Sequence, residues 1–91
     1  MPTRTLPPRP SLHQLKIQAN ELRRAHRDRD LSAAGRIAAH HPEMKGWPLR
    51  AVLDKPLAVA DAQLVIAQEY GFRNWSELKR RIEQARLTGR P

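Results

Sequence analysis

Several residue types are scarce or absent in this chain. It contains no cysteine, so disulfide bonds, thiolate metal sites and cysteine nucleophiles are excluded. With only four glycines it has no glycine-rich phosphate loop. No apolar stretch approaches the roughly 18 residues that a membrane span needs, and the first residues contain no apolar stretch of signal-peptide length. We therefore expect a cytoplasmic protein that a helical core or a partner stabilises.

Acidic residues are few beside the basic ones. Nine Asp and Glu stand against 17 Lys and Arg, which gives a net charge of +8. Residues 1–30 carry seven basic and three acidic side chains, residues 31–72 carry four of each, and residues 73–91 carry six and two. Both ends are therefore basic. This pattern predicts an anionic partner such as nucleic acid, an acidic protein surface or an anionic membrane surface, although a solvated basic surface has the same composition.

Prolines and apolar periodicity divide the chain. Four of the eight prolines lie in residues 1–10, which predicts an extended arm. Apolar residues then recur at helical spacing, with neither a strand-like alternation nor an internal repeat. We predict a small all-α single-domain bundle in residues 11–87, followed by a tail at 88–91. Its helices are expected at 12–28, 31–41, 59–70 and 75–87, with a short extra helix near 48–54.

Capping residues mark several of these helix ends. Ser11, Asp30 and Asn74 each precede a helical pattern, where a side-chain oxygen can accept a hydrogen bond from a free main-chain N–H. Gly71 has the position of a left-handed residue that ends the third predicted main helix. The alanine-rich helix at 31–41 contains Gly35 and has little bulk, so we expect it to depend on close packing against a neighbour.

The segment DAQLVIAQEYGFRNWSELKRRI, residues 61–82, has the outline of a helix-turn-helix that reads DNA. Ala67 and Gly71 match its small first-helix residue and its turn glycine. In that motif the buried positions of the second helix would be Glu77 and Arg80. The apolar stripe instead consists of Trp75, Leu78 and Ile82. We therefore interpret the segment as a capped helical hairpin that completes the core, with a true DNA-reading helix-turn-helix as the alternative.

Basic side chains outside the apolar stripes form two candidate surfaces for phosphate. On the first predicted helix these are Lys16, Arg23, Arg24 and Arg27. At the last helix they are Arg73, Lys79, Arg80, Arg81 and Arg86. If the two helices lie side by side, the stripes merge into one face that contacts phosphates without base specificity. The four aromatic residues, Trp47, Tyr70, Phe72 and Trp75, are all expected in the core or in caps, which disfavours base stacking.

No metal, cofactor or catalytic site is predicted. His40 and His41 are adjacent, so their side chains point about 100° apart on a helix and do not share a metal ion. No serine, acidic pair or histidine falls into a pattern that indicates nucleophilic or acid–base catalysis. We therefore predict a protein that is not an enzyme.

Two phrases together carry a resemblance that spans about residues 6–83. The first phrase is LPPRPSLHQLKIQANELRRAHR with AAHHP, and the second is ADAQLVIAQEYGFRNWSELKRRI. Both are similar to a small helical domain of uncharacterised bacterial proteins, often N-terminal to ankyrin repeats. The resemblance implies a helical accessory module without an established catalytic role. The segment MKGWPLRAVLDK departs from that pattern as an apparent insertion.

Charge and resemblance together predict a non-enzymatic basic binding module. Its leading partner is the phosphate backbone of RNA or DNA, because the basic excess is large. The alternative is an acidic or helical protein partner, because ankyrin arrays are protein-binding surfaces.

Overall fold

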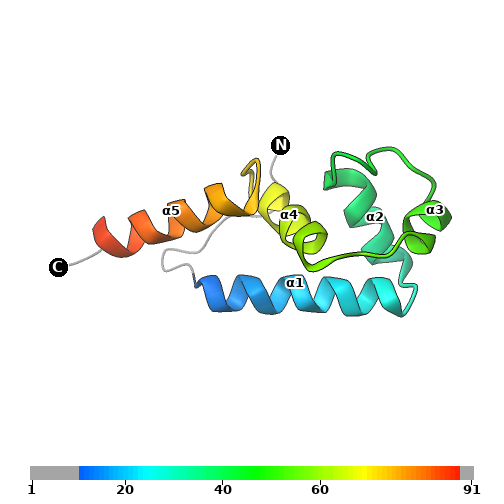
Figure 1. Ribbon diagram of the computed structural model, residues 1–91, viewed down its shortest axis with the longest axis horizontal. Coiled ribbons are helices and arrows are strands. Elements are labelled where there is room, and N and C mark those ends of the chain that lie inside the picture. The colour runs from blue at the N-terminus through cyan, green and yellow to red at the C-terminus, as the bar shows by residue number, and fades with distance from the viewer. Residues whose placement is uncertain (1–10, 89–91) are drawn as a thin grey trace.

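The computed structural model describes residues 11–88, without the side chains of residues 86–88, and Figure 1 shows their arrangement. Five helices form: α1 (Leu12–Arg27), α2 (Leu31–His40), α3 (Leu49–Asp54), α4 (Val59–Glu69) and α5 (Trp75–Thr88). No strand occurs within these residues, so the predicted all-α bundle is confirmed. Every helix begins and ends within one residue of its predicted bounds. The predicted arm at 1–10 and residues 89–91 of the predicted tail lie outside the described residues.

The predicted capping residues begin three of these helices. The side-chain oxygens of Ser11, Asp30 and Asn74 accept main-chain N–H groups two or three residues later, at 3.3, 2.8 and 2.9 Å. These contacts satisfy N–H groups that have no partner inside the helix. Local sequence therefore sets where α1, α2 and α5 begin.

Two helices end in the same left-handed turn. Gly71 has a φ of +89°, and the next N–H donates to the carbonyl of Ala67 at 2.9 Å, which confirms the predicted ending of α4. The end of α1 has the same hydrogen bonds, with the N–H of Asp30 donating to the carbonyl of Ala25 at 3.0 Å. There the left-handed residue is Arg29, with a φ of +58°, which is unfavourable for a residue other than glycine.

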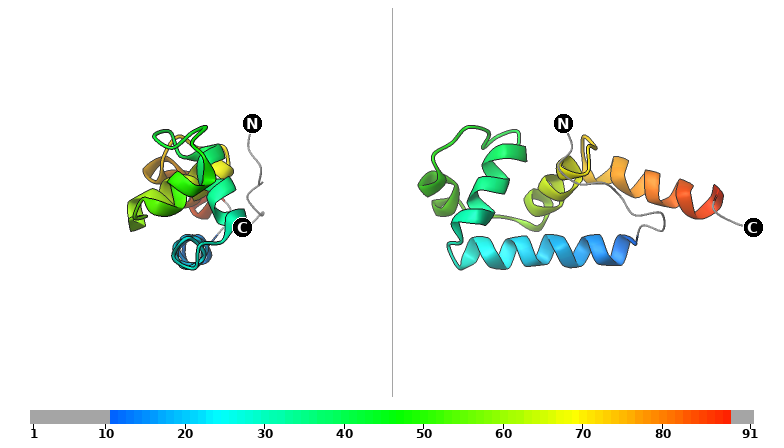
Figure 2. Two further views of the ribbon diagram at one scale, coloured as in Figure 1. Left: turned by 90° about the vertical axis from the view of Figure 1, so that its right-hand side faces the viewer. Right: turned by 180° about the vertical axis from the view of Figure 1, so that it is seen from behind.

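The helix α4 is the centre of the fold. It packs against α1, α2 and α5, while α3 packs against α2 on the side away from α5 (Figures 1 and 2). The core includes Leu22, Ile37, Ile66 and Leu78, which are all at most 1% exposed. The first turn of α4 is less buried, because Val59 is 44% exposed.

The molecule is elongated, with principal extents of 49 × 22 × 17 Å. The cause is α5, which docks on α4 through Leu78 and Ile82 and then continues past the start of α1 (Figures 1 and 2). No helix within residues 11–88 is both long and apolar enough to cross a lipid bilayer.

An ion pair joins α2 to α4 inside the core. Arg36 donates from Nε and Nη2 to the two carboxylate oxygens of Glu69, at 2.7 and 2.6 Å. The Glu69 side chain is 4% exposed and that of Arg36 is 32% exposed. The hydrogen bond to Glu69 raises the pKa of Arg36 above its ordinary value, against the opposing effect of burial. Arg36 therefore stays charged.

The helix α2 packs closely against its neighbours, in agreement with the expectation from its low bulk, but Gly35 takes no part in this packing. A methyl group added at Gly35 would meet no atom within 4 Å. The alanines beside it, Ala33 and Ala34, are the residues that bring α2 close to its neighbours.

We therefore expect Gly35→Ala to raise the free energy of unfolding by about 1 kcal/mol, because alanine favours the helix and meets no obstacle. Gly46→Ala is the matched control: it also has open space, but its φ of +80° suits glycine, so about 1 kcal/mol should be lost. Urea unfolding followed by circular dichroism measures both. Destabilisation by Gly35→Ala would show that the helix needs glycine there.

Candidate anion-binding surfaces

The first basic surface lies along α1. We call it the α1 basic stripe, and it consists of Lys16, Arg23, Arg24 and Arg27. At 100° per residue these four positions fall within an arc of about 100° that borders the buried face. Arg23 is half-buried and the other three are exposed. The acidic Glu21 and Asp28 lie outside the arc, and no carboxylate among residues 11–88 pairs with a member of the stripe.

The second basic surface lies on α5. We call it the α5 basic cluster, and it consists of Lys79, Arg80 and Arg81, all exposed. Two of these side chains line a shallow hollow of about 210 Å³ together with Ser76 and Glu83, so a carboxylate lies among them. Arg73, in the turn before α5, is paired with Glu77 at 3.3 Å. Arg86 belongs to α5, but its side chain is outside the described residues.

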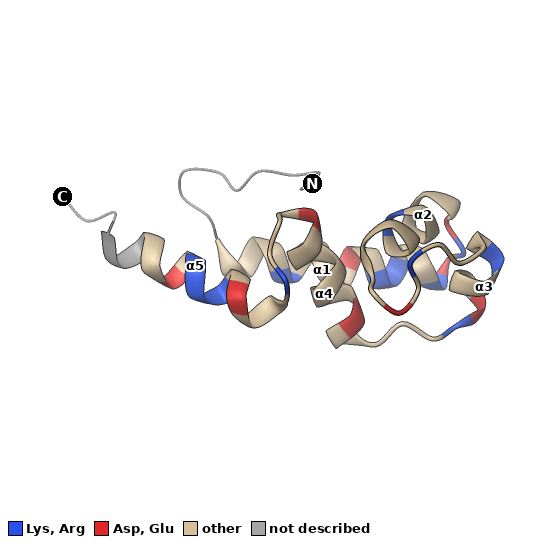
Figure 3. Cartoon of the chain, turned by 90° about the horizontal axis from the view of Figure 1, so that it is seen from above, with Lys and Arg blue, Asp and Glu red and all other residues tan. Residues whose placement is uncertain are grey.

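The two surfaces do not form the single face that side-by-side terminal helices would create. Instead α1 packs on α4 and α2, α5 packs on α4, and α5 extends beyond the start of α1 (Figures 1 and 2). Figure 3 accordingly shows Lys and Arg along the whole length of the molecule. The condition for one merged basic face is therefore not met, because the helical hairpin carries α5 away from α1.

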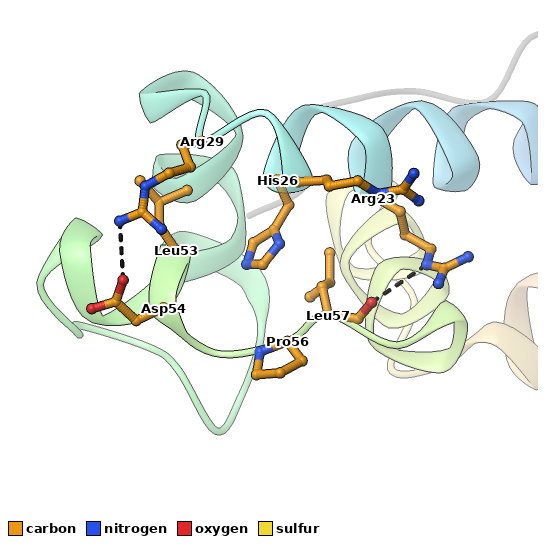
Figure 4. Close-up of a pocket in the computed structure, with 8 residues that line it drawn as sticks. Arg23, His26, Arg29, Leu53, Asp54, Pro56 and Leu57 are labelled. Atoms are coloured by element: carbon orange, nitrogen blue, oxygen red, sulfur yellow. Dashed lines mark hydrogen bonds and ion pairs between the residues drawn. The ribbon is translucent and has the colours of Figure 1, made fainter.

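A groove that the sequence did not indicate lies between the end of α1 and the connector from α3 to α4 (Figure 4). Its volume is about 340 Å³. Its polar lining consists of Arg23, His26, Arg27, Arg29 and Asp54, and its apolar lining of Leu53, Pro56 and Leu57. We call it the arginine groove. It contains two members of the α1 basic stripe and brings a third arginine to them.

Hydrogen bonds fasten the walls of the arginine groove. The Nε of Arg23 donates to the carbonyl of Leu57 at 3.4 Å, and the Nη2 of Arg29 donates to Asp54 at 3.0 Å (Figure 4). The buried ring of His26 donates from Nε2 to the carbonyl of Val52 at 2.8 Å. Each contact joins α1 or its end to α3 or the connector. Their partners are 25 to 34 residues apart, so periodicity along the sequence could not reveal them.

A larger hollow of about 560 Å³ lies between the end of α2 and the turn from α4 to α5. Its basic lining groups are His40, Lys45 and Arg73, with the half-buried ring of Phe72 among them. The charge of Arg73 is offset by Glu77. This hollow therefore offers an anion a weaker field than the arginine groove does.

His41 has a structural role. Its Nδ1 accepts the N–H of Glu43 at 3.2 Å, so the proton lies on Nε2, which donates to Asp61 at 2.9 Å. Burial of Asp61 favours its neutral form, but the hydrogen bonds from His41 and from the N–H of Ala58 lower its pKa below the ordinary value. Within the described residues no three His, Asp or Glu side chains are grouped to hold a metal ion.

The aromatic residues are not all in the core. Tyr70, Phe72 and Trp75 are half-buried against it, as predicted. Trp47 is 39% exposed, so its predicted burial was wrong. Met44, three residues earlier in the same loop, is fully buried and belongs to the core.

The rotational phase of α5, that is, which of its residues face the core, shows whether α4 and α5 form a standard DNA-reading helix-turn-helix. Leu78 is fully buried and Ile82 is 2% exposed, as the apolar stripe predicted. Arg80, one of the two positions that a standard DNA-reading helix would bury, is exposed, and Glu77 is only half-buried. The hairpin of α4 and α5 therefore completes the core and does not have the phase of a standard reader.

Comparisons of the chain with models of protein families, with curated proteins and with solved structures gave no match. The resemblance to a helical domain of bacterial proteins therefore stays a prediction. A function has to be inferred from the surfaces described above.

Proposed function

We propose that this protein is a non-enzymatic helical module that contacts the phosphate backbone of nucleic acid, with the α1 basic stripe as its principal surface. The observation that carries the proposal is a row of basic side chains with no acidic residue within its arc. From Lys16 to Arg27 the row extends about 16 Å along the helix axis. A row of this length and charge suits several successive phosphates.

The α1 basic stripe supports the proposal better than the α5 basic cluster does. At 100° per residue, Glu77 and Glu83 fall within the arc that the cluster spans, and Glu83 lines the same hollow as Lys79 and Arg80. The carboxylates repel phosphate and shorten the reach of the basic field. We expect the cluster to add to binding, and the stripe to dominate it.

The proposal predicts how steeply the binding constant K for nucleic acid falls as the salt concentration rises. If the four side chains of the stripe each neutralise one phosphate, log K falls by roughly 3.6 per unit of log salt. The affinity then drops roughly 100-fold between 50 and 200 mM salt. Contacts to phosphate alone carry no base specificity, so duplex DNA and structured RNA of different sequence should bind with similar affinity.

The test compares three double variants that each lower the net charge by four. Lys16→Glu/Arg24→Glu changes the stripe, Lys79→Glu/Arg80→Glu changes the cluster, and Lys45→Glu/Arg50→Glu is the control on the α2–α3 loop and α3. All six side chains are exposed, so the fold should persist, which circular dichroism checks. Fluorescence anisotropy of labelled duplex DNA and structured RNA over a salt series measures binding.

We expect the stripe variant to bind at least about 10-fold more weakly than the control and to lose roughly two units of salt slope. Equal weakening in all three variants would mean that only the net charge matters. The proposal would be wrong if the unchanged protein failed to bind either nucleic acid in dilute salt.

One observation favours the alternative function, the binding of a protein partner. Leu31, Trp47 and Leu49 are 63, 39 and 39% exposed, and tryptophan is enriched in protein interfaces. A protein partner bound there should remain bound when excess nucleic acid is added, whereas a partner on the stripe should be displaced.

A further inference from the structure

We propose that the arginine groove binds a small phosphate monoester, with its phosphate held between Arg23 and Arg27. The proposal does not depend on polymer binding, because a single phosphate group can be held by the two arginines. Its basis is the way in which the fold places two arginines of one helix face against a connector far away in the sequence.

Arg23 and Arg27 are one helical turn apart, so their Cβ atoms lie about 5–6 Å from each other on the same face of α1. Both line the groove. A guanidinium donates two parallel hydrogen bonds to phosphate oxygens, so two neighbouring arginines can hold one phosphate from two sides. Arg27 makes no hydrogen bond or ion pair with any residue of the described part of the chain.

The groove is organised before a ligand arrives. Arg23 is half-buried, and the carbonyl of Leu57 holds its Nε, which directs the outer edge of the guanidinium (Figure 4). His26 anchors the opposite wall through Val52. Because Arg23 and His26 are held in this way, ligand binding loses little conformational entropy at these two side chains.

The acidic side chain that lines the groove is already neutralised. Asp54 is paired with Arg29 at 3.0 Å. The last carbonyls of α1 would repel an anion, but those of residues 24, 25 and 26 accept N–H groups from residues 28, 30 and 29 at 3.0 Å each. The charges of Arg23 and Arg27 therefore remain for the ligand.

The size of the groove restricts the ligand. A volume of about 340 Å³ is at the lower end of the range of about 300–1,000 Å³ for ligand pockets. Leu53, Pro56 and Leu57 provide an apolar floor beside the arginines. These features suit a phosphate that carries one small organic group, such as a mononucleotide.

The experiment is an NMR titration of the ¹⁵N-labelled protein with inorganic phosphate, with adenosine 5′-monophosphate and with adenosine. We expect saturable shifts at the N–H groups of residues 23–29, 53–55 and 57 with both phosphates and none with adenosine. Arg27→Gln should weaken the binding at least about 10-fold, because a charge-assisted hydrogen-bond pair is lost. Arg24→Gln removes a neighbouring charge that does not line the groove, so this substitution should change the binding affinity less than about twofold.

Failure to saturate at about 10 mM phosphate or monophosphate would overturn the proposal, because such binding is weaker than millimolar. So would equal weakening by Arg24→Gln and Arg27→Gln, which would indicate general attraction to the basic stripe. Polymer binding is tested through Lys16 and Arg24, which lie outside the groove lining, so either proposal can fail while the other holds.

Discussion

Replacing Arg36 by methionine should lower the free energy of unfolding by about 3 kcal/mol. The change leaves the Glu69 carboxylate, whose side chain is only 4% exposed, without its two charged hydrogen bonds. Breaking a buried ion pair on one side costs about 3–5 kcal/mol, and we take the lower end because Arg36 is 32% exposed. For a domain of this size the midpoint of thermal unfolding should fall by roughly 15 °C.

Two further variants separate charge from packing. Arg29→Met makes the same substitution in the exposed pair with Asp54, where at most about 1 kcal/mol should be lost. Arg36→Met/Glu69→Leu removes both charges and should recover most of the stability, since the apolar pair leaves no buried charge. If the double variant is as unstable as Arg36→Met alone, the ion pair acts through the packing of its side chains and our electrostatic explanation is wrong.

Leu78→Ala should also lower the free energy of unfolding by about 3 kcal/mol. Leu78 is fully buried between α5 and α4, and α4 is the helix on which α5 packs most extensively. Removing three carbon atoms leaves a cavity between the two helices. Helix α5 cannot move to close this cavity without disturbing the contact that its own Ile82 makes with the core. Urea unfolding, followed by circular dichroism and by tryptophan fluorescence, measures the loss.

Arg80→Ala is the control for the phase of α5. Arg80 is exposed, so its truncation should change the stability by no more than about 0.5 kcal/mol. A DNA-reading hairpin of the standard phase would reverse this order, because it buries position 80. A larger effect of Arg80→Ala than of Leu78→Ala would therefore refute the described packing of α5.

Local interactions explain why the helices could be predicted. The caps at Ser11, Asp30 and Asn74 each involve residues within three positions of one another. The ending at Gly71 depends on one positive φ and on carbonyls in the preceding turn. Such signals are complete within a short segment, so the bounds follow from the sequence to within one residue.

Contacts between distant residues could not be predicted in the same way. Arg36 and Glu69 are 33 residues apart, and neither is distinguished from an ordinary surface charge by its neighbours in the sequence. Trp47 suits a buried position by its residue type, and only the packing decides that it is 39% exposed while Met44 is fully buried. Competition for one space in the core is settled by the shapes of all its members.

The candidate surfaces, too, could be predicted from the sequence only where they depend on residues of a single helix. Helical periodicity alone places Lys16, Arg24 and Arg27 on one exposed face of α1, and the structure has them there. It could not show that the connector before α4 crosses this face, or that Arg29 would join Arg23 and Arg27 at a groove. It also left open whether α1 and α5 lie side by side.

By itself the sequence determined the all-α class, the bounds of the helices, the phase of α5 and the strong positive charge, because each depends on neighbours along the chain. Only the tertiary structure decided that α5 leads away from α1, that Glu69 is a buried partner of Arg36, and that three arginines meet at one groove. These outcomes depend on how five helices share one core around α4. That arrangement is a property of the whole chain, since every helix limits where the others can pack.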